Sequence, residues 1–393
     1  MRPSALFLSP EAPYPATGGG PLRSSALLEY LACRYAVDLI VFREPGAPDP
    51  RAAVPAGIAR RVDVIDLPYH SRTFLARMVR NAVRYLRNRP PLNDRFAGFA
   101  APLARLLAGR QYNLAVVEHF WCAPYCEQLE PHAARTVLDL HNVESVYYGR
   151  SAGVEPWPAS AVLRRFERAC RSLERKWIPR FSIVLAASEH DANLVRAICP
   201  ETHPHVYPNT IPFTPQPDAV EQNVLAFSGN FDYQPNIGAV RFFRKRIWPL
   251  LRDRWPGLVW RLIGKNPTGI ARLVAGDPRI EVTGPVADAV EALATARVVV
   301  APLLAGSGTR VKILEAWAAG RAVVSTSLGA EGLPVRSGEH LLLADSPEAF
   351  AEAVSRLLAS PEERLRLGRA GRALYEKRFT REQGWKELAR IGM

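Results

Sequence analysis

The chain has 393 residues, of which 48% are hydrophobic, and it carries 51 Lys and Arg against 38 Asp and Glu. This length exceeds that of a single ordinary domain, since domains cluster at about 100–200 residues. The apolar fraction excludes an intrinsically disordered protein. No stretch reaches the roughly 18–20 apolar residues of a membrane span, and the first residues lack the apolar run of a secretory signal. We therefore expect a cytoplasmic protein of two domains.

The net charge of +13 is shared almost equally by the two halves of the chain, and most of the cations are Arg. Such a charge fits nucleic acid, a membrane surface or an Arg-rich composition. No recognised nucleic-acid-binding module accompanies it, so we expect no nucleic acid as partner. The five Cys are scattered without a CxxC pair, which indicates neither a disulfide framework nor a thiolate zinc site.

Short apolar runs alternate with helix-like stretches along the whole chain, the pattern of a parallel α/β fold. In the first half the runs are 5–8, 37–42, 114–117, 136–140 and 183–186, and in the second half 224–227, 259–263, 280–283, 298–301 and 322–325. Mostly apolar strands need cover on both faces, so we expect helices on both sides of each sheet. The fold class is α/β, with two Rossmann-like domains that face a cleft.

A proline-rich segment separates the two halves. Residues 207–217 hold four Pro, which forbid a continuous helix and favour an extended linker. We place the first domain at 1–207, the linker at 208–217 and the second domain at 218–375. Ligands of such sheets bind outside the carboxyl ends of strands, so the residues after each strand are the candidates for function.

The most informative of these segments is 300–320, where a strand runs into a Gly-containing loop and a helix. Ser307 or Thr309 can cap this helix, whose free backbone N–H groups favour a phosphate, and Arg310 and Lys312 add positive charge. Glu315 lies six residues after Thr309 and so about 9 Å further along the helix axis at 1.5 Å per residue. This is a plausible distance from a diphosphate to a ribose diol. The alternative is a solvated glutamate on an ordinary crossover helix.

This segment resembles the donor site of the retaining glycosyltransferases of family 4, which have the two-domain GT-B fold, and the resemblance covers nearly the whole chain. The family has two glutamates eight residues apart, where this chain has Ser307 and Glu315. The resemblance implies that Glu315 binds the ribose of a nucleotide-sugar and that Thr309, Arg310 and Val311 offer backbone amides to its diphosphate. Ser307 remains able to bond a sugar hydroxyl.

The turn at 228–236 resembles the family's other phosphate-binding segment. Many members have an Arg and a Lys where this chain has Asn230 and Asn236. Neutral amides do not balance the charge of a diphosphate, so we expect Lys265 and either Arg310 or Lys312 to do so. Lys265 follows a strand on the expected cleft side; the alternative is a solvated surface lysine.

Two segments of the first half complete the expected donor side. Gly19 and Gly20 belong to a Gly-rich turn after the first strand, which the family uses near the donor phosphates; the alternative is a mobile loop without a ligand. His119 and His141 each follow the end of a strand. A single histidine at such a place usually has a structural role, whereas two at equivalent strand ends indicate a functional one. The resemblance implies that His119 lies close to the transferred sugar.

The acceptor side is expected around His141, Asn142 and Glu144, again by resemblance. A general base could be Glu118, Asp139 or Glu144, or none. The family is usually described with a front-face mechanism, in which the leaving phosphate helps to deprotonate the acceptor, so no protein nucleophile is required. The residues that we expect to act in catalysis are His119, Glu315 and Ser307.

Residues 70–89 have a helical period and six Arg without an acidic residue. One side is apolar, formed by Leu75, Met78, Val79, Ala82 and Leu86, and the opposite side holds Arg77, Arg80, Arg84 and Arg87. One interpretation is a surface for the membrane of a lipid-linked acceptor, reached through the segment from Arg72 to Arg89. The other is a solvated helix over the core of the first domain.

The sequence therefore predicts a retaining hexosyltransferase-like enzyme that moves a sugar from a nucleotide diphosphate sugar to a glycan or lipid-linked acceptor, in cell-surface polysaccharide or glycoconjugate synthesis. We expect no cofactor and no metal, because the chain has no DxD triplet and Arg, Lys and a helix start supply the positive charge. It would be cytoplasmic, with peripheral contact at the inner membrane face. In the family the final helices, here 376–393, often pack on the first domain.

Two alternatives share this fold, a nucleotide-sugar-binding protein without turnover and a nucleotide-sugar epimerase. The neutral residues Ser307, Asn230 and Asn236 motivate the first of them. A dinucleotide oxidoreductase is disfavoured, because no GxGxxG opens a βαβ unit with an acidic residue about 20 positions further on.

Overall fold

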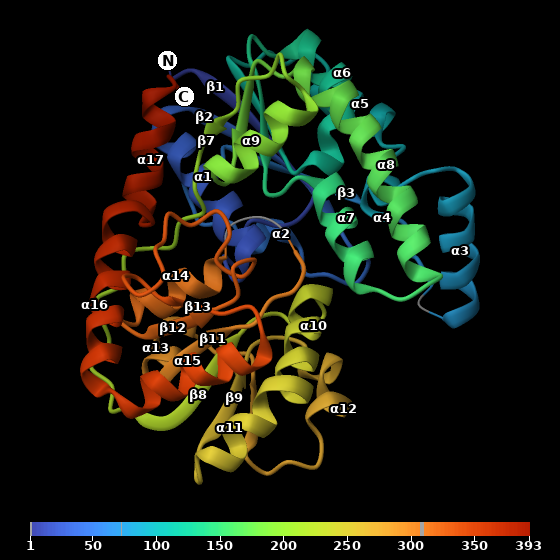
Figure 1. Ribbon diagram of the computed structural model, residues 1–393. Helices are drawn as coiled ribbons and strands as arrows, with labels where there is room; N and C mark the ends of the chain where they lie inside the picture. The colour runs from blue at the N-terminus through green and yellow to red at the C-terminus, as the bar shows by residue number, and fades with distance from the viewer. Residues whose placement is uncertain (1, 72, 307–309) are drawn as a thin grey trace. The chain divides into compact units, whose positions relative to one another are not determined.

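The computed structural model describes residues 2–71, 73–306 and 310–393 (Figure 1). The chain forms two compact units. Unit 1 contains Met1–Pro208 together with Trp385–Met393, and unit 2 contains Asn209–Gly384. Residues 208–217 hold no helix or strand, as their prolines require, apart from one bridge that pairs Ile211 with Thr380 inside unit 2.

Unit 1 is built on a parallel sheet of seven strands in the order β3-β2-β1-β4-β5-β6-β7. The strands are β1 Ser4–Ser9, β2 Ala36–Arg43, β3 Arg61–Asp66, β4 Leu114–Glu118, β5 Thr136–Leu140, β6 Ile183–Ala186 and β7 His205–Val206. Alternate side chains enter two hydrophobic clusters, with Leu6 and Leu8 of β1 in one and Ala5 and Phe7 in the other. The sheet is therefore buried on both faces, as its apolar strands predict.

Helices connect the strands of unit 1. They are α1 Gly19–Arg34, α2 Pro50–Ala53, α3 Phe74–Leu86, α4 Pro91–Arg95, α5 Ala100–Leu107, α6 Cys126–Leu129, α7 Glu144–Val154, α8 Ala159–Trp177 and α9 Glu189–Ile198. Short 3-10 turns occupy Phe120–Tyr125, Glu130–His132 and Ile178–Arg180. The end of the chain packs on α1, where Trp385 donates to the carbonyl of Ala26 at 2.8 Å and Tyr30 donates to that of Met393 at 2.6 Å.

Unit 2 repeats the design with a parallel sheet of six strands in the order β10-β9-β8-β11-β12-β13. Its strands are β8 Gln222–Ser228, β9 Val259–Ile263, β10 Ile280–Gly284, β11 Ala296–Ala301, β12 Ala322–Ser325 and β13 Leu342–Leu343. Its helices are α10 Gln234–Phe242, α11 Trp248–Arg254, α12 Ala271–Val274, α13 Ala289–Ala294, α14 Val311–Ala318, α15 Pro347–Ala359 and α16 Pro361–Arg378, with a π-helical turn at Phe243–Ile247 and a 3-10 turn at Pro267–Gly269. Helix α17 Arg381–Arg390 begins in unit 2 and ends in unit 1.

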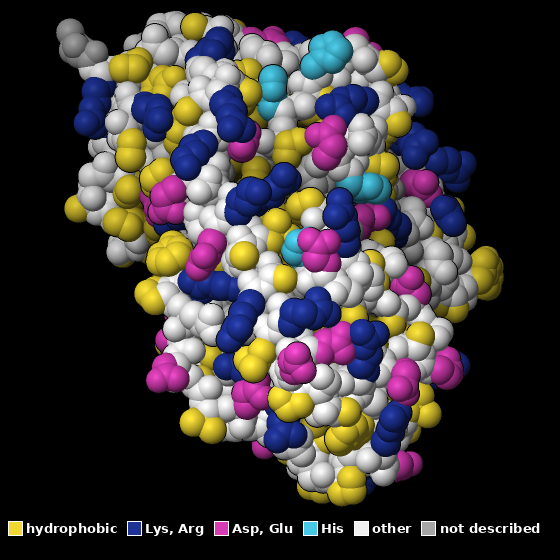
Figure 2. Space-filling model, turned by 60° about the vertical axis from the view of Figure 1, so that its left-hand side comes forward, with side chains coloured by type: hydrophobic (Ala, Val, Ile, Leu, Met, Phe, Trp, Pro, Cys, Tyr) yellow, Lys and Arg dark blue, Asp and Glu magenta, His cyan; other side chains and the backbone are white. Residues whose placement is uncertain are grey.

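The α/β class with two parallel sheets is confirmed, and each of the ten apolar runs lies in a strand. Three strands were not expected from the sequence. Strand β3 alternates polar and apolar residues at the sheet edge, and β7 and β13 have two residues each. None of the described helices has the length and apolar composition that crossing a membrane requires. On the face in Figure 2, Lys and Arg side chains are interspersed with Asp and Glu, so the basic excess is not one patch there.

Helix α3 forms where the helical period predicts it. Its packing differs from the interpretation in which the helix covers the core of the first domain. The apolar residues expected on one side are exposed, Leu75 at 68% and Leu86 at 75%, while Arg84 on the other side is buried. The helix therefore does not lay its apolar side over the core of unit 1.

Candidate functional site

Two groups of polar side chains follow strands at their carboxyl ends, one in each unit, and each group is described by itself. In unit 2 the group surrounds the start of α14, the helix that follows β11. The expected residues Ser307 and Thr309 lie outside the described residues. Arg310 directly precedes the helix; its guanidinium is buried and donates to the carbonyl of Leu328 at 3.2 Å.

Glu315 lies one turn into α14 and points toward the end of β8. Its carboxylate accepts a hydrogen bond of 3.2 Å from Ser228, the last residue of that strand. Burial raises the pKa of Glu315 to about 7, although the charge of Lys312 opposes the shift. The side chain is half-buried and bonded, so it is not the solvated glutamate of the alternative interpretation.

Lys312 joins α14 to the loop after β8. Its ammonium donates to Asn236 Oδ1 at 3.1 Å, and the amide of Asn236 donates to the carbonyl of Asn230 at 2.9 Å. Burial, with the nearby charge of Arg310, lowers the pKa of Lys312 to about 8. The structure thus brings together three of the expected donor-site residues, with the lysine supplying the charge that the two amides lack.

The loop of Lys265, after β9, lies against the same segment. The carbonyl of Lys265 accepts from the backbone N–H of Phe231 at 2.9 Å, and Asn266 donates to the side chain of Asn230 at 2.8 Å. Gly264 has a φ of 148°, and a Cβ there would overlap the carbonyl oxygen of Gly229. Only glycine allows so close an approach of two backbones. The side chain of Lys265 itself is exposed, beside this junction.

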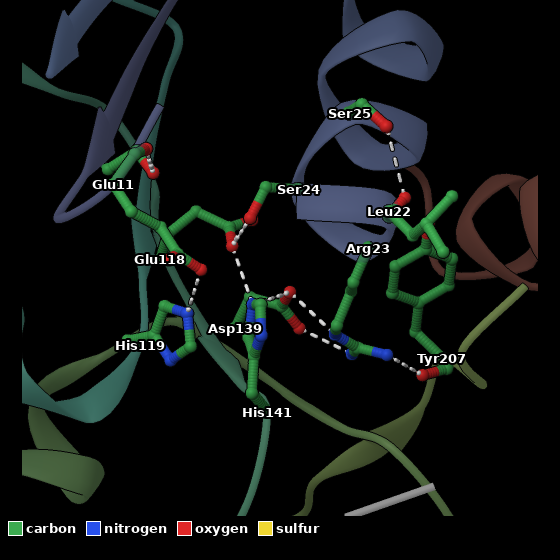
Figure 3. A network of polar contacts seen from close by, with 11 residues as sticks. Glu11, Leu22, Arg23, Ser24, Ser25, Glu118, His119, Asp139, His141 and Tyr207 are labelled. Carbon is green, nitrogen blue, oxygen red and sulfur yellow. Dashed lines mark hydrogen bonds and ion pairs between the residues drawn. The ribbon is translucent and has the colours of Figure 1, made fainter. Parts of the chain in front are cut away.

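In unit 1 a buried network of charges lies beneath the strand ends of β4 and β5 (Figure 3). Arg23 of α1 makes a two-pronged ion pair with Asp139, with N···O distances of 2.5 and 2.8 Å, and donates to the carbonyl of Tyr207 at 2.6 Å. Burial opposes ionisation of Asp139, but Arg23 and His141 outweigh it and lower its pKa. The aspartate is therefore a fixed negative charge below the histidines.

His141 is held by two carboxylates. Its Nε2 lies 2.6 Å from Glu118 Oε2, which also accepts from Ser24 at 2.6 Å, and 3.5 Å from Asp139 Oδ2. Burial disfavours a charged imidazole, yet Glu118 and Asp139 more than compensate and raise the pKa of His141 to about 9. The two carboxylates thus favour the protonated form of His141.

His119 lies on the ring of His141, with centroids 3.6 Å apart, and its other face stacks on Trp121 at 4.2 Å. Its backbone has a φ of 60°, a conformation that a non-glycine residue seldom adopts. Burial and the charge of His141 lower the pKa of His119 to about 4, although Glu11, whose Oε1 is 3.5 Å from Nε2, opposes the shift. His119 is therefore neutral.

Asn142 and Glu144, expected on the acceptor side, are bonded to each other. Glu144 Oε1 accepts from Asn142 at 2.9 Å and from the indole of Trp121 at 2.8 Å. Burial raises the pKa of Glu144 to about 7. Because Trp121 also stacks on His119, the two expected groups of unit 1 are one continuous assembly.

Gly19 and Gly20 open α1, whose first turn is close to a carboxylate. A Cβ on Gly20 would overlap Glu11, so the glycine makes room for this side chain. Sequence reasoning missed Glu11 as well as three polar partners, Arg23, Ser24 and Ser228. Arg23 and Ser24 interrupt the apolar side of α1, a signal that could have marked them as buried polar residues.

Glu118, His119 and His141 are one group of potential metal ligands, with ligand atoms within 4.8 Å of one another. The two imidazole rings of this group are stacked, with their planes 30° apart. In addition, Nε2 of His141 is committed to Glu118. In the structure this nitrogen is therefore engaged within the protein.

Part of unit 2 is similar in sequence to a known protein family. Residues 222–360 match the family model described as glycosyl transferases group 1. This region contains the whole cluster around α14. A curated relative, described as an uncharacterized 44.6 kDa protein in the cps region of Klebsiella pneumoniae, is 23% identical over 363 residues, covering 88% of this chain and 89% of that protein.

Solved structures of GT-B glycosyltransferases share the fold over nearly the full chain. Sucrose-phosphate synthase from Thermosynechococcus elongatus has a TM-score of 0.74 at 19% identity, covering 99% of this chain and 98% of that one. HepE from Anabaena, in complex with UDP and glucose, has a TM-score of 0.69 at 14% identity and 99% coverage of both. TarM has a TM-score of 0.70 at 9% identity, covering 99% of this chain and 98% of that one. The expected GT-B fold is confirmed.

Proposed function

We propose that the protein is a retaining glycosyltransferase that transfers a sugar from a nucleotide diphosphate sugar to a glycan or lipid-linked acceptor. The observation that carries this proposal is the position of Glu315, one turn into α14, bonded to Ser228 and next to Lys312, within the region that matches glycosyl transferases group 1. Structures of HepE, a protein with the same fold, were solved with UDP and with UDP-glucose, which supports a donor of this class.

Donor binding is assigned to unit 2. Glu315 accepts hydrogen bonds from the two ribose hydroxyls, and the backbone at Thr309, Arg310 and Val311 donates to the diphosphate. The positive charge comes from Lys312, Arg310 and Lys265, so the reaction requires no metal ion. Ser307 bonds a hydroxyl of the sugar. Asn230 and Asn236 position Lys312 rather than carry charge themselves, as the hydrogen bond between Asn236 and Lys312 indicates.

Unit 1 supplies the remaining residues, in roles taken from the resemblance to the family. His119, as a neutral imidazole, bonds the transferred sugar, and the start of α1 at Gly19 and Gly20 serves the donor phosphates. His141, Asn142 and Glu144 belong to the acceptor side. The leaving phosphate deprotonates the acceptor in a front-face reaction, so that the configuration of the sugar is retained without a protein nucleophile.

The acceptor belongs to cell-surface polysaccharide or glycoconjugate synthesis in this proposal. The Klebsiella pneumoniae relative is described by its place in a cps region, which supports such a role. A lipid-linked acceptor brings the enzyme to the inner face of a membrane from the cytoplasm.

Two other functions are compatible with the fold, a nucleotide-sugar-binding protein without turnover and a nucleotide-sugar epimerase. The absence of charge at Asn230 and Asn236 favours the former over an ordinary transferase. Product analysis separates the three functions.

The test is incubation of the protein with nucleotide diphosphate sugars, with and without a panel of glycan and lipid-linked acceptors, in the presence of a chelator. A new glycoside with the anomeric configuration of the donor supports the proposal. Release of an isomerised sugar without acceptor identifies an epimerase, and donor binding without any product identifies a binding protein. An inverted anomeric configuration, or an absolute need for a divalent metal, contradicts the mechanism.

A further inference from the structure

Helix α3 turns its apolar side to the solvent. Five large apolar side chains of this helix are more than half exposed: Phe74 at 76%, Leu75 at 68%, Met78 at 54%, Val79 at 61% and Leu86 at 75%. They recur at the helical period, so they form one continuous side. A surface helix of a globular protein normally has the reverse orientation, with this side against the core.

Polar contacts hold α3 in this orientation. Arg84 is buried and pairs with Asp94 of α4 at 2.8 Å, and Arg80 donates to the carbonyl of Ser71 at 3.2 Å. On the other flank Arg165 of α8 donates to the carbonyl of Tyr85 at 2.9 Å and lies 4.6 Å above its ring. Because Arg80 and Arg84 are bonded to the protein, rolling the helix to bury its leucines would break these contacts.

The neighbourhood of α3 has the composition of a membrane interface. Tyr69, shortly before the helix, is 75% exposed, and Trp157, shortly before the adjoining helix α8, is 80% exposed. Tyr and Trp are enriched where a protein meets lipid headgroups, because one end of the ring system is apolar and the other polar. Figure 1 shows α3 beside α8 at the outer edge of unit 1.

The charged residues of α3 and its flanking segments are all basic. No Asp or Glu occurs between Asp66 and Asp94, a stretch with six Arg. Arg77, Arg87 and Arg89 are exposed. Exposed basic residues beside an apolar helix side are complementary to anionic lipid headgroups.

We propose that the exposed side of α3 is a docking surface for an anionic membrane. The helix lies in the plane of the interface, with Leu75, Val79 and Leu86 in the boundary between headgroups and acyl chains. Arg87 and Arg89, which follow the last residue of the helix, lie on lipid phosphates. This inference does not rest on the proposed transferase activity, since it concerns binding to lipid without donor or acceptor.

The test is co-sedimentation of the full chain with vesicles of phosphatidylcholine alone and of phosphatidylcholine with phosphatidylglycerol. We expect the wild-type protein to bind the anionic vesicles, and added salt to weaken this binding. The double variant Leu75→Glu, Leu86→Glu replaces two exposed side chains, so it leaves the fold intact and lowers vesicle affinity at least about tenfold. The matched control is Leu250→Glu, Leu365→Glu, which changes two exposed leucines of unit 2 and leaves binding unchanged.

A second pair of variants separates charge from insertion. Arg87→Gln with Arg89→Gln reduces binding to anionic vesicles and removes most of its salt dependence. Wild-type protein that ignores both kinds of vesicle, or an α3 double variant that binds as well as the control, overturns the proposal. A wild-type dimer that the α3 variant dissociates also overturns it, because the apolar side then belongs to a second copy of the chain. Circular dichroism melting of every variant verifies folding.

Discussion

The imidazole ring of His119 stacks on that of His141, with 3.6 Å between the ring centroids. The two rings have opposite tendencies, since Glu118 and Asp139 hold a proton on His141 whereas burial and this neighbouring charge keep His119 neutral. A neutral imidazole has one donor and one acceptor nitrogen, so it can bond a sugar hydroxyl in either direction. The carboxylates of Glu118 and Asp139 thereby influence the protonation of His119 through the charge that they favour on His141.

Removal of the charge on His141 should raise the pKa of His119. In the variant His141→Gln we expect the pKa of His119 to move up from about 4 toward the ordinary histidine value, because its charged neighbour is gone while burial still opposes protonation. NMR titration of the ring protons measures this shift, with the distant His190 as an internal reference. An unchanged titration of His119 would show that the two rings are not electrostatically coupled.

The shifted pKa values of His119 and His141 predict that stability has a maximum at an intermediate pH. The pKa of His141 is raised in the folded state. Its contribution to the free energy of unfolding is therefore full below the unfolded pKa of 6.5 and is lost as pH rises through about 9. The pKa of His119 is lowered, so its contribution is full above 6.5 and is lost as pH falls through about 4. Both effects follow from proton linkage, with a slope of at most about 1.4 kcal/mol per pH unit for each group.

We therefore expect these two groups to give the free energy of unfolding a maximum near pH 6.5, as measured by urea denaturation across pH. In His141→Gln the decline between pH 6.5 and 9 should become shallower. A variant whose alkaline decline equals that of the wild type would be at odds with an ionised His141.

Arg23 should be essential for the stability of unit 1. Replacement of Arg23 by Met removes the two-pronged ion pair with Asp139 and the hydrogen bond to the carbonyl of Tyr207 in a fully buried site. Loss of one partner of a buried ion pair costs about 3–5 kcal/mol. Urea denaturation measures the loss. The control Arg254→Met breaks an exposed pair with Glu352 and should change stability far less.

The positions of ten strands could be predicted from the sequence because buried parallel strands are continuous apolar runs, and all ten predicted runs are strands. Strand β3 escaped this criterion because it is an edge strand with Arg61, Asp63 and Asp66 among its six residues. The clusters around Glu315 and His119 were anticipated because each residue follows a strand, the position at which parallel sheets gather their polar side chains.

The contacts within those clusters depend on tertiary packing that the local pattern does not contain. Arg23 lies 116 residues before Asp139, and Ser228 lies 87 residues before Glu315. Helix α3 shows the same limit, since the periodicity identified its two sides but not which of them faces the protein. That orientation is decided by Asp94 and Arg165, which lie outside the helix.

Glu315 also predicts how donor affinity depends on pH. With a pKa of about 7 it must lose a proton to offer two charged acceptor oxygens to the ribose hydroxyls, so affinity should rise as pH increases through 7. Lys312, with a pKa of about 8, loses its positive charge above that value, so affinity for a diphosphate should fall again. Calorimetric titration with a nucleoside diphosphate from pH 6 to 9 tests for such a maximum.

The most direct measurement is the affinity of Glu315→Gln for nucleoside diphosphates and their sugars by isothermal titration calorimetry. The amide keeps the shape of the side chain but replaces a charged acceptor, so we expect affinity to fall about 10- to 100-fold with the melting temperature little changed. Glu291→Gln, on the exposed surface of α13, is the matched control and should bind as the wild type does. Wild-type affinity in Glu315→Gln would contradict a ribose site at α14 and with it the glycosyltransferase mechanism proposed for this chain.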